Sequence, residues 1–199
     1  TNASLDLSPD VTAPRLASAY PESPAALQVL FSESLDKNTA LQPNAFQLSP
    51  SRSISAVEVL TDHPFVLRLS LAEVLQPGVV YTLSASPSVS DCSGNTVAAD
   101  NKVLTGLAEA PESQDVVINE IMADPDPGIG LPEVEWVELH NRSARIIDLG
   151  SLSLSDGSSA PATLPGYLMF PGNYVVIAAA SVAATLRPFS PGAVLATSI

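Results

Sequence analysis

The stretch Leu27-Gln28-Val29-Leu30-Phe31-Ser32 decides the fold class, because every second residue from Leu27 onward is strongly apolar. Successive side chains of a strand point to opposite faces, so Leu27, Val29 and Phe31 would share one buried face. The same period of two recurs in residues 54–60, 65–71 and 79–84. Turn-forming residues separate these runs, at Asp62-His63-Pro64, Pro77-Gly78 and Ser93-Gly94-Asn95. Short strands at this spacing, with no helix-length apolar pattern between them, predict an all-β sandwich.

A second block of strands begins at Val116–Met122 and continues through a strong strand over Val134–His140. In that strand the alternation places Trp136, Glu138 and His140 on one face, and Val137 and Leu139 on the other. Further strand-like runs follow at residues 146–149, 152–156 and 173–178. Short helical turns are expected at residues 34–41 and 181–186. The chain is therefore predicted to be all-β, with two β-sandwich (Ig-like) domains in tandem.

The two blocks are expected to be separate domains. The stretch between them carries Pro111 and several polar residues without periodicity, which is typical of an interdomain linker. We assign the chain to an N-terminal extension, a first sandwich, a linker and a second sandwich, at residues 1–9, 10–107, 108–114 and 115–199. Since the second block reaches only five or six elements before Ile199, we expect it to be C-terminally truncated, with a sheet edge open to another chain.

The composition excludes several classes of partner. The net charge is −13, with only 8 Lys plus Arg among 199 residues. Nucleic acids and anionic membrane surfaces are bound mainly through basic residues, so neither is expected as a partner. No apolar run of about 18 residues occurs, so no membrane insertion is expected. The single cysteine, Cys92, excludes an internal disulfide. The first residues lack Met and an apolar core, so we expect any signal or anchor to lie outside this sequence.

Five short motifs occur in order along the first block: Asp10-Val11-Thr12-Ala13-Pro14, Leu30-Phe31-Ser32-Glu33-Ser34-Leu35-Asp36, Asn44-Ala45-Phe46-Gln47-Leu48, Pro77-Gly78-Val79-Val80-Tyr81-Thr82-Leu83 and Ser90-Asp91-Cys92-Ser93-Gly94-Asn95. Their order and spacing resemble those of bacterial Ig-like domains of the surface-layer-protein type. The resemblance covers roughly residues 10–107 and implies an Ig-like sandwich.

The second block carries its own set of motifs: Ile118-Asn119-Glu120-Ile121-Met122, Glu135-Trp136-Val137-Glu138-Leu139-His140-Asn141, Asp148-Leu149, Leu154-Ser155-Asp156-Gly157 and Pro171-Gly172-Asn173-Tyr174-Val175-Val176. These resemble the lamin-tail domain in its bacterial version. The sequence departs from the family at His140, where an aromatic residue such as Tyr is usual. It also departs at the end, where later strands of the family should follow Ile199, so the resemblance implies a partial domain.

Together the two families resemble parts of exported multidomain proteins of Bacteroidetes. The resemblance implies an extracellular or cell-surface location and a non-catalytic structural or interaction module, as a spacer or in adhesion. The expected partners are other domains of the same polypeptide and a surface protein or polysaccharide, with edge-strand self-association as a further route. The alternative is a substrate- or carbohydrate-binding accessory region of an exported nuclease or other hydrolase.

The sequence offers no recognisable catalytic site. A serine hydrolase needs a His beside its nucleophile, whereas His63 falls in a turn and His140 in mid-strand, and no Gly-x-Ser-x-Gly elbow occurs. Two carboxylates facing one cleft could support glycoside hydrolysis. Glu135 and Glu138 would point to opposite faces of their strand, although Glu138 could face Glu120 on a paired strand. We therefore predict no enzyme and no catalytic residues.

The acidic loop after residue 122 is a candidate calcium site. Hard cations take several oxygen ligands, and acidic loops supply them. The candidate ligands are Glu120, Asp124, Asp126, Glu133 and Glu135. The alternative is that the two Asp-Pro pairs of this loop are ordinary turn formers. Calcium is therefore the one cofactor that the sequence raises.

Two further positions have competing interpretations. Asp91, Gly94 and Asn95 would form a structural turn, in which Asp91 binds backbone N–H groups and Gly94 adopts a positive φ. Trp136 is the only Trp, and it is either a core residue or a binding platform on which a sugar stacks. The candidate binding residue, Trp136, lies on the second block.

Overall fold

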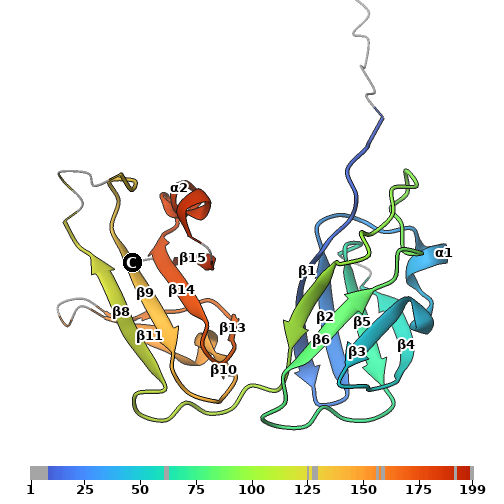
Figure 1. Ribbon diagram of the computed structural model, residues 1–199, viewed down its shortest axis with the longest axis horizontal. Helices are drawn as coiled ribbons and strands as arrows, with labels where there is room; N and C mark the ends of the chain where they lie inside the picture. The colour runs from blue at the N-terminus through green and yellow to red at the C-terminus, as the bar shows by residue number, and fades with distance from the viewer. Residues whose placement is uncertain are drawn as a thin grey trace, which may run out of the picture. The chain divides into compact units, whose positions relative to one another are not determined.

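The computed structural model of the chain describes residues 9–60, 63–124, 126, 130–155, 157, 160–190 and 192–197 (Figure 1). The chain divides into two compact units, Thr1–Leu107 and Ala108–Ile199, and each has hydrophobic clusters of its own. The predicted all-β class is confirmed, because the helices are single turns. Apart from Pro9, the expected N-terminal extension lies outside the described residues. No helix in the described ranges is long and apolar enough to cross a membrane.

The first unit is a sandwich of two antiparallel sheets. One sheet has the strand order β1-β2-β5-β4 and the other the order β3-β6-β7. The strands are β1 (Leu16–Ser23), β2 (Ala26–Phe31), β3 (Phe46–Ser49), β4 (Ile54–Val59), β5 (Val66–Leu71), β6 (Tyr81–Ala85) and β7 (Lys102–Thr105). Leu27, Val29 and Phe31 are buried in one cluster, so the predicted inner face of β2 is confirmed.

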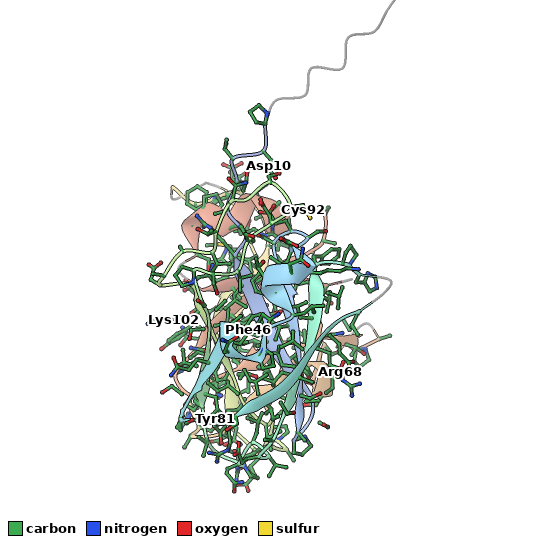
Figure 2. The ribbon with its side chains drawn as sticks, turned by 90° about the vertical axis from the view of Figure 1, so that its right-hand side faces the viewer. Asp10, Phe46, Arg68, Tyr81, Cys92 and Lys102 are labelled. Carbon is green, nitrogen blue, oxygen red and sulfur yellow. The ribbon has the colours of Figure 1, made fainter. Side chains whose placement is uncertain are left out.

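Short helical elements connect the two sheets of the first unit. The single-turn helix α1 (Lys37–Ala40) begins after Asp36, whose carboxylate accepts a 3.0 Å hydrogen bond from the Asn38 backbone N–H. A 3-10 turn, η1 (Pro43–Ala45), leads into β3. The helical turn expected at residues 34–41 is therefore confirmed. Figure 2 shows Asp10 and Cys92 at one end of this unit and Tyr81 toward the opposite end.

The second unit is built around a four-stranded sheet in the order β15-β14-β9-β8. Two small ribbons, β10-β13 and β11-β12, complete it. The elements are β8 (Val116–Met122), β9 (Trp136–Asn141), β10 (Ile147–Asp148), η2 (Leu149–Ser151), β11 (Ser153–Leu154), β12 (Ala162–Thr163), β13 (Leu168–Met169), β14 (Tyr174–Ala179), α2 (Ala183–Leu186), η3 (Arg187–Phe189) and β15 (Ala193–Thr197). The described part of this unit thus has more elements than the five or six that the sequence predicts.

Apolar side chains cover both faces of this sheet. On one face, Leu139 and Val175 pack with residues of the ribbons, such as Met169. On the other face, Trp136 packs with residues of β14 and of α2. The predicted alternation along β9 is therefore confirmed. Because α2 and η3 cover only part of the second face, the sheet leaves a hollow there.

The stretch expected to be a free linker is bonded into the second unit. The Glu109 N–H donates to the Ile146 carbonyl at 2.8 Å. The Arg145 guanidinium binds the carboxylates of Glu112, at 2.5 Å, and Asp115, at 2.9 Å. Hydrogen bonds from the backbone N–H of Glu112 and from Arg145 hold the pKa of Asp115 below its usual value. Residues from Glu109 onward therefore belong structurally to the second unit.

Candidate functional site

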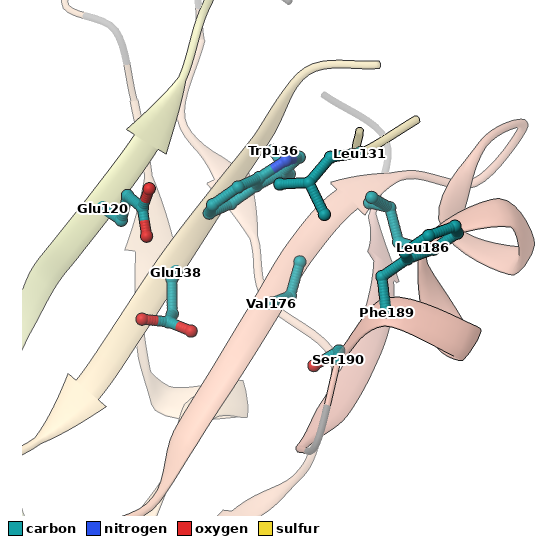
Figure 3. Close-up of a pocket in the computed structure, with 8 residues that line it drawn as sticks. All are labelled: Glu120, Leu131, Trp136, Glu138, Val176, Leu186, Phe189 and Ser190. Atoms are coloured by element: carbon teal, nitrogen blue, oxygen red, sulfur yellow. The ribbon is translucent and has the colours of Figure 1, made fainter. Parts of the chain in front are cut away.

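A cavity of about 190 Å³ lies on the partly covered face of the sheet in the second unit. Its floor is formed by neighbouring strands, with Glu120 from β8, Trp136 and Glu138 from β9 and Val176 from β14. Its wall comes from the segment that joins β14 to β15, together with Leu131. Figure 3 shows the carboxylates on one side and the apolar wall on the other. The cavity is therefore acidic at one end and apolar at the other.

The acidic end is set by the register of β8 and β9. Glu120 pairs directly with Glu138, a facing that the sequence allowed if the two strands paired. A bulge between Ile118 and Glu120 inserts Asn119 into β8, and its side-chain amide donates to Glu138 Oε1 at 2.7 Å. Like charges directly opposite each other on paired strands are destabilising. Within the described ranges, neither carboxylate forms an ion pair, because the ion pairs observed there join Arg68 and Arg145 to other acidic residues.

The centre of the floor is Trp136. Its side chain is buried, with 8% of the residue exposed, and it packs with Val176, Ala178 and Leu186. The indole Nε1–H is buried, and none of the described residues accepts a hydrogen bond from it. In Figure 3 this nitrogen lies on the ring edge next to Leu131. An unpaired buried donor costs about 1–3 kcal/mol, so this N–H is a polar group that the described residues leave unsatisfied.

The wall is formed by the connection between two parallel strands. β14 and β15 pair in parallel, and parallel neighbours need a crossover between them. Here the crossover is short and contains α2 and η3, which present Leu186 and Phe189 to the cavity. Leu186 is buried, whereas Phe189 is 53% exposed. The apolar wall therefore continues from the cavity onto the surface.

The two histidines lie in different units, and each packs on an aromatic ring. His140 stacks on Tyr174, with ring centroids 4.1 Å apart and planes at 3°. His63 lies at a tilt beside Phe65, with centroids 5.9 Å apart. His140 stands where the resemblance led us to expect an aromatic residue such as Tyr, and here its flat imidazole stacks on an aromatic ring. Neither arrangement is that of a histidine poised beside a nucleophile.

The structure does not gather the five candidate calcium ligands into one site. Glu120 lines the cavity on the Trp136 face, while Glu135 lines a second cavity with Ile121 and Val137. Alternation along the strand places Glu120 and Glu135 on opposite faces of the sheet. Asp124, Asp126 and Glu133 are exposed. Calcium binding by this loop stays a prediction, which thermal unfolding with calcium and with a chelator would test.

A different carboxylate cluster occurs in the first unit, and the sequence did not point to it. Carboxylate oxygens of Asp10, Glu33 and Asp91 lie within 4.8 Å of one another. Burial, followed by the negative charges of Asp10 and Asp91, raises the pKa of Glu33. Such oxygens are the ligand type of hard cations. The three residues are far apart in the sequence, so only the fold brings them together.

Asp91 also organises the turn at residues 91–95. Its carboxylate accepts from the backbone N–H groups of Ser93 and Asn95, each at 2.8 Å, and from the Asn95 side-chain amide at 2.8 Å. Gly94 adopts a φ of +91°. The side-chain bond from Asn95, with these backbone bonds, lowers the pKa of Asp91. Cys92, between them, is exposed and has a free thiol.

Both resemblances inferred from the sequence are confirmed by comparison with family models. Residues 10–105 match the model described as bacterial Ig-like domain. Residues 109–197 match the model described as Lamin Tail Domain. The two matches meet close to the division between the two compact units. A comparison with curated proteins finds no match.

Solved structures of the bacterial surface-layer (S-layer) protein SbsC are similar to the chain. The N-terminal part of SbsC is 20% identical, with a TM-score of 0.45, and the match covers 55% of this chain and 26% of that one. SbsC domains 1–6 are 16% identical, with a TM-score of 0.45, over 81% of this chain and 19% of that one. The chain thus spans about a quarter or less of these proteins. Likeness at this level does not bear on function.

Proposed function

We propose that this chain, which joins a bacterial Ig-like domain to a lamin tail domain, is a non-catalytic structural and interaction module of an exported, cell-surface protein. The observation that carries the proposal is that each unit is a self-contained β-sandwich with its own buried clusters. Such units hold their shape without a ligand and present loops and sheet edges to partners. The spacer and adhesion roles both follow from this construction.

The surfaces for interaction lie on the second unit. β8 is an edge strand, paired with β9 alone within the described sheets. Ile118 and Ile121 on this strand are 51% and 58% exposed. An edge with free backbone groups and exposed apolar side chains is a template for strand addition. We therefore place the contact with a surface protein, or with a second chain, along β8.

The absence of catalysis is part of the proposal and needs its own test. Glu120 and Glu138 face the same cavity, and paired carboxylates are the groups that glycoside hydrolases use. We expect the purified chain to release no product from a panel of polysaccharides. Hydrolysis by the wild-type chain that is lost in Glu138→Gln would contradict the proposal.

The location is tested with antibodies raised against the chain. We expect them to label intact, non-permeabilised cells that produce the full-length protein, and brief protease treatment of those cells to remove the signal. A mutant that lacks the gene supplies the background. Labelling that appears only after permeabilisation would overturn the proposed surface role.

A further inference from the structure

We propose that the cavity of the second unit binds a basic side chain of a protein partner, a lysine or an arginine. In this arrangement the cationic end lies beside Glu120 and Glu138, and the aliphatic stem packs on Trp136 and Val176. The proposal deepens the interaction role given above by naming the chemistry that the surface recognises. It does not depend on where the full-length protein resides.

Charge is the first argument for a basic occupant. Glu120 and Glu138 are directly paired across β8 and β9, and within the described ranges no Lys, Arg or His nitrogen forms an ion pair with either. Their mutual repulsion is therefore left without a compensating cation. A ligand cation beside both carboxylates would remove this repulsion. A neutral or anionic ligand would not.

The aromatic residue beside the carboxylates favours the same occupant. Trp136 lies two positions before Glu138, on the same face of β9. Cations are attracted to the face of an indole ring, which is the best of the aromatic rings for this contact. The apolar lining by Val176 and Leu186 suits the methylene stem of a long basic side chain. The cationic end and the apolar stem of a basic side chain thus each have a matching surface in the cavity.

The size of the cavity favours a single side chain. Sites for drug-sized molecules enclose roughly 300–1,000 Å³, whereas this one encloses about 190 Å³. The cavity therefore has room for one side chain rather than for a larger ligand.

The surroundings favour a protein over a free amine. Phe189 lines the cavity and is 53% exposed, and β8, which carries Glu120, is an edge strand of the described sheet. Apolar surface next to the cavity is what neighbouring residues of a bound peptide would cover. A second copy of this chain could still pair along the β8 edge, but it is a poor source of the basic side chain for this cavity, because each copy carries a net charge of −13. The complementary partner is a basic segment of another protein.

The test uses the single tryptophan of the full chain as its reporter. Trp136 gives the only indole N–H signal in a ¹⁵N–¹H NMR spectrum, since the sequence contains one Trp. We would titrate the chain with three probes: the capped peptides Ala-Lys-Ala and Ala-norleucine-Ala, and the diamine cadaverine. We expect a saturable shift of the Trp136 signal with the lysine peptide, weakened by added salt, and none with the norleucine peptide.

Variants decide whether the carboxylates are responsible. Glu120→Gln and Glu138→Gln are each expected to weaken binding of the lysine peptide about tenfold, as for the loss of a charged hydrogen-bond partner. Both remove a repulsion, so both should remain folded. Glu135→Gln is the matched control, because Glu135 lines the other cavity, and it should bind like wild type.

Three results would overturn the proposal. The first is an equal shift with the norleucine peptide, which would show an apolar site only. The second is unchanged binding in both glutamine variants. The third is saturation by cadaverine without any response to the lysine peptide, which would assign the cavity to free amines. None of these outcomes would contradict surface labelling of intact cells, so the two proposals fail separately.

Discussion

Asn141 joins the loop after β9 to strand β13 through hydrogen bonds of its buried side chain. It is fully buried, yet its side chain is completely paired. The amide donates to the carbonyls of Arg145 and Met169, each at 2.8 Å, and its oxygen accepts from the N–H and hydroxyl of Ser143, at 3.0 and 2.7 Å. A buried polar side chain with this many bonds fixes the backbone around it. This accounts for the Asn that ends the motif of residues 135–141.

We expect Asn141→Ala to lower the free energy of unfolding of the second unit by about 3 kcal/mol, because it leaves several buried groups unpaired. Urea unfolding followed by Trp136 fluorescence reports on that unit alone. Asn119→Ala is the control, since Asn119 is exposed, and it should change the free energy by less than about 0.5 kcal/mol. Similar losses for both variants would contradict the role given to Asn141.

Asp91 makes the stability of the first unit depend on pH. The pKa of Asp91 is lowered in the folded state. Its ionised carboxylate therefore stabilises the folded state at pH values above 3.8, the usual pKa of an aspartate. That contribution is lost as the pH falls through the lower, folded value. We therefore expect wild type to be more stable than Asp91→Asn near neutral pH, and the difference to vanish in strong acid.

Thermal unfolding by circular dichroism between about pH 2 and pH 6 would measure this difference. Asp100→Asn, at an exposed position of the same unit, changes the net charge by the same amount. It should show no comparable loss at neutral pH. A difference between wild type and Asp91→Asn that grows as the pH falls would have the wrong sign for this account.

At the level of elements, the strands that could be predicted are those with a clear apolar pattern in the sequence. β2, β5, β8 and β14 each carry a clear apolar pattern over at least six residues, and the sequence located all of them. β1 contains Pro21 and was missed, although an edge position tolerates proline. The runs predicted at residues 146–149 and 152–156 contain β10 and β11, whereas β12 and β13 were missed, because two residues each are too few to establish a period. Their pairing is set by the core they cover.

β15 was missed for a different reason, which is its dependence on a close approach of two backbones. A Cβ added at Gly192, just before β15, would lie 2.6 Å from the Tyr174 carbonyl oxygen. Only glycine permits this contact. The parallel pairing of β14 with β15 therefore depends on Gly192, and no periodicity in the sequence could have shown it.

We expect Gly192→Ala to destabilise the second unit by about 1–3 kcal/mol, because the new methyl group forces β15 away from β14. Hydrogen exchange should become faster at the amides of Ala193–Thr197 than at those of β9. Gly166→Ala is the control, since a Cβ there comes no nearer than 4.0 Å to Asp148. Unchanged exchange along β15 would contradict the account of this crossover.

For the molecule as a whole, the sequence predicted the division into units better than the site. Local patterns and motifs were enough to assign two sandwiches and both families. The sequence allowed for Glu120 and Glu138 to face each other, because this arrangement needs only the pairing of two strands. The apolar wall from Leu186 and Phe189 was not foreseen, since it depends on the crossover to β15. The cluster of Asp10, Glu33 and Asp91 also required the complete fold.

The central claim is that two separately folded sandwiches act in series as a structural module. Pulling single molecules of the full chain by their termini tests it most directly. The account predicts two discrete unfolding events, each releasing about 30 nm of chain, the extended length of roughly 90 residues. Asn141→Ala should lower the force of one event only. A single event of about 60 nm, or extension without resistance, would contradict the claim.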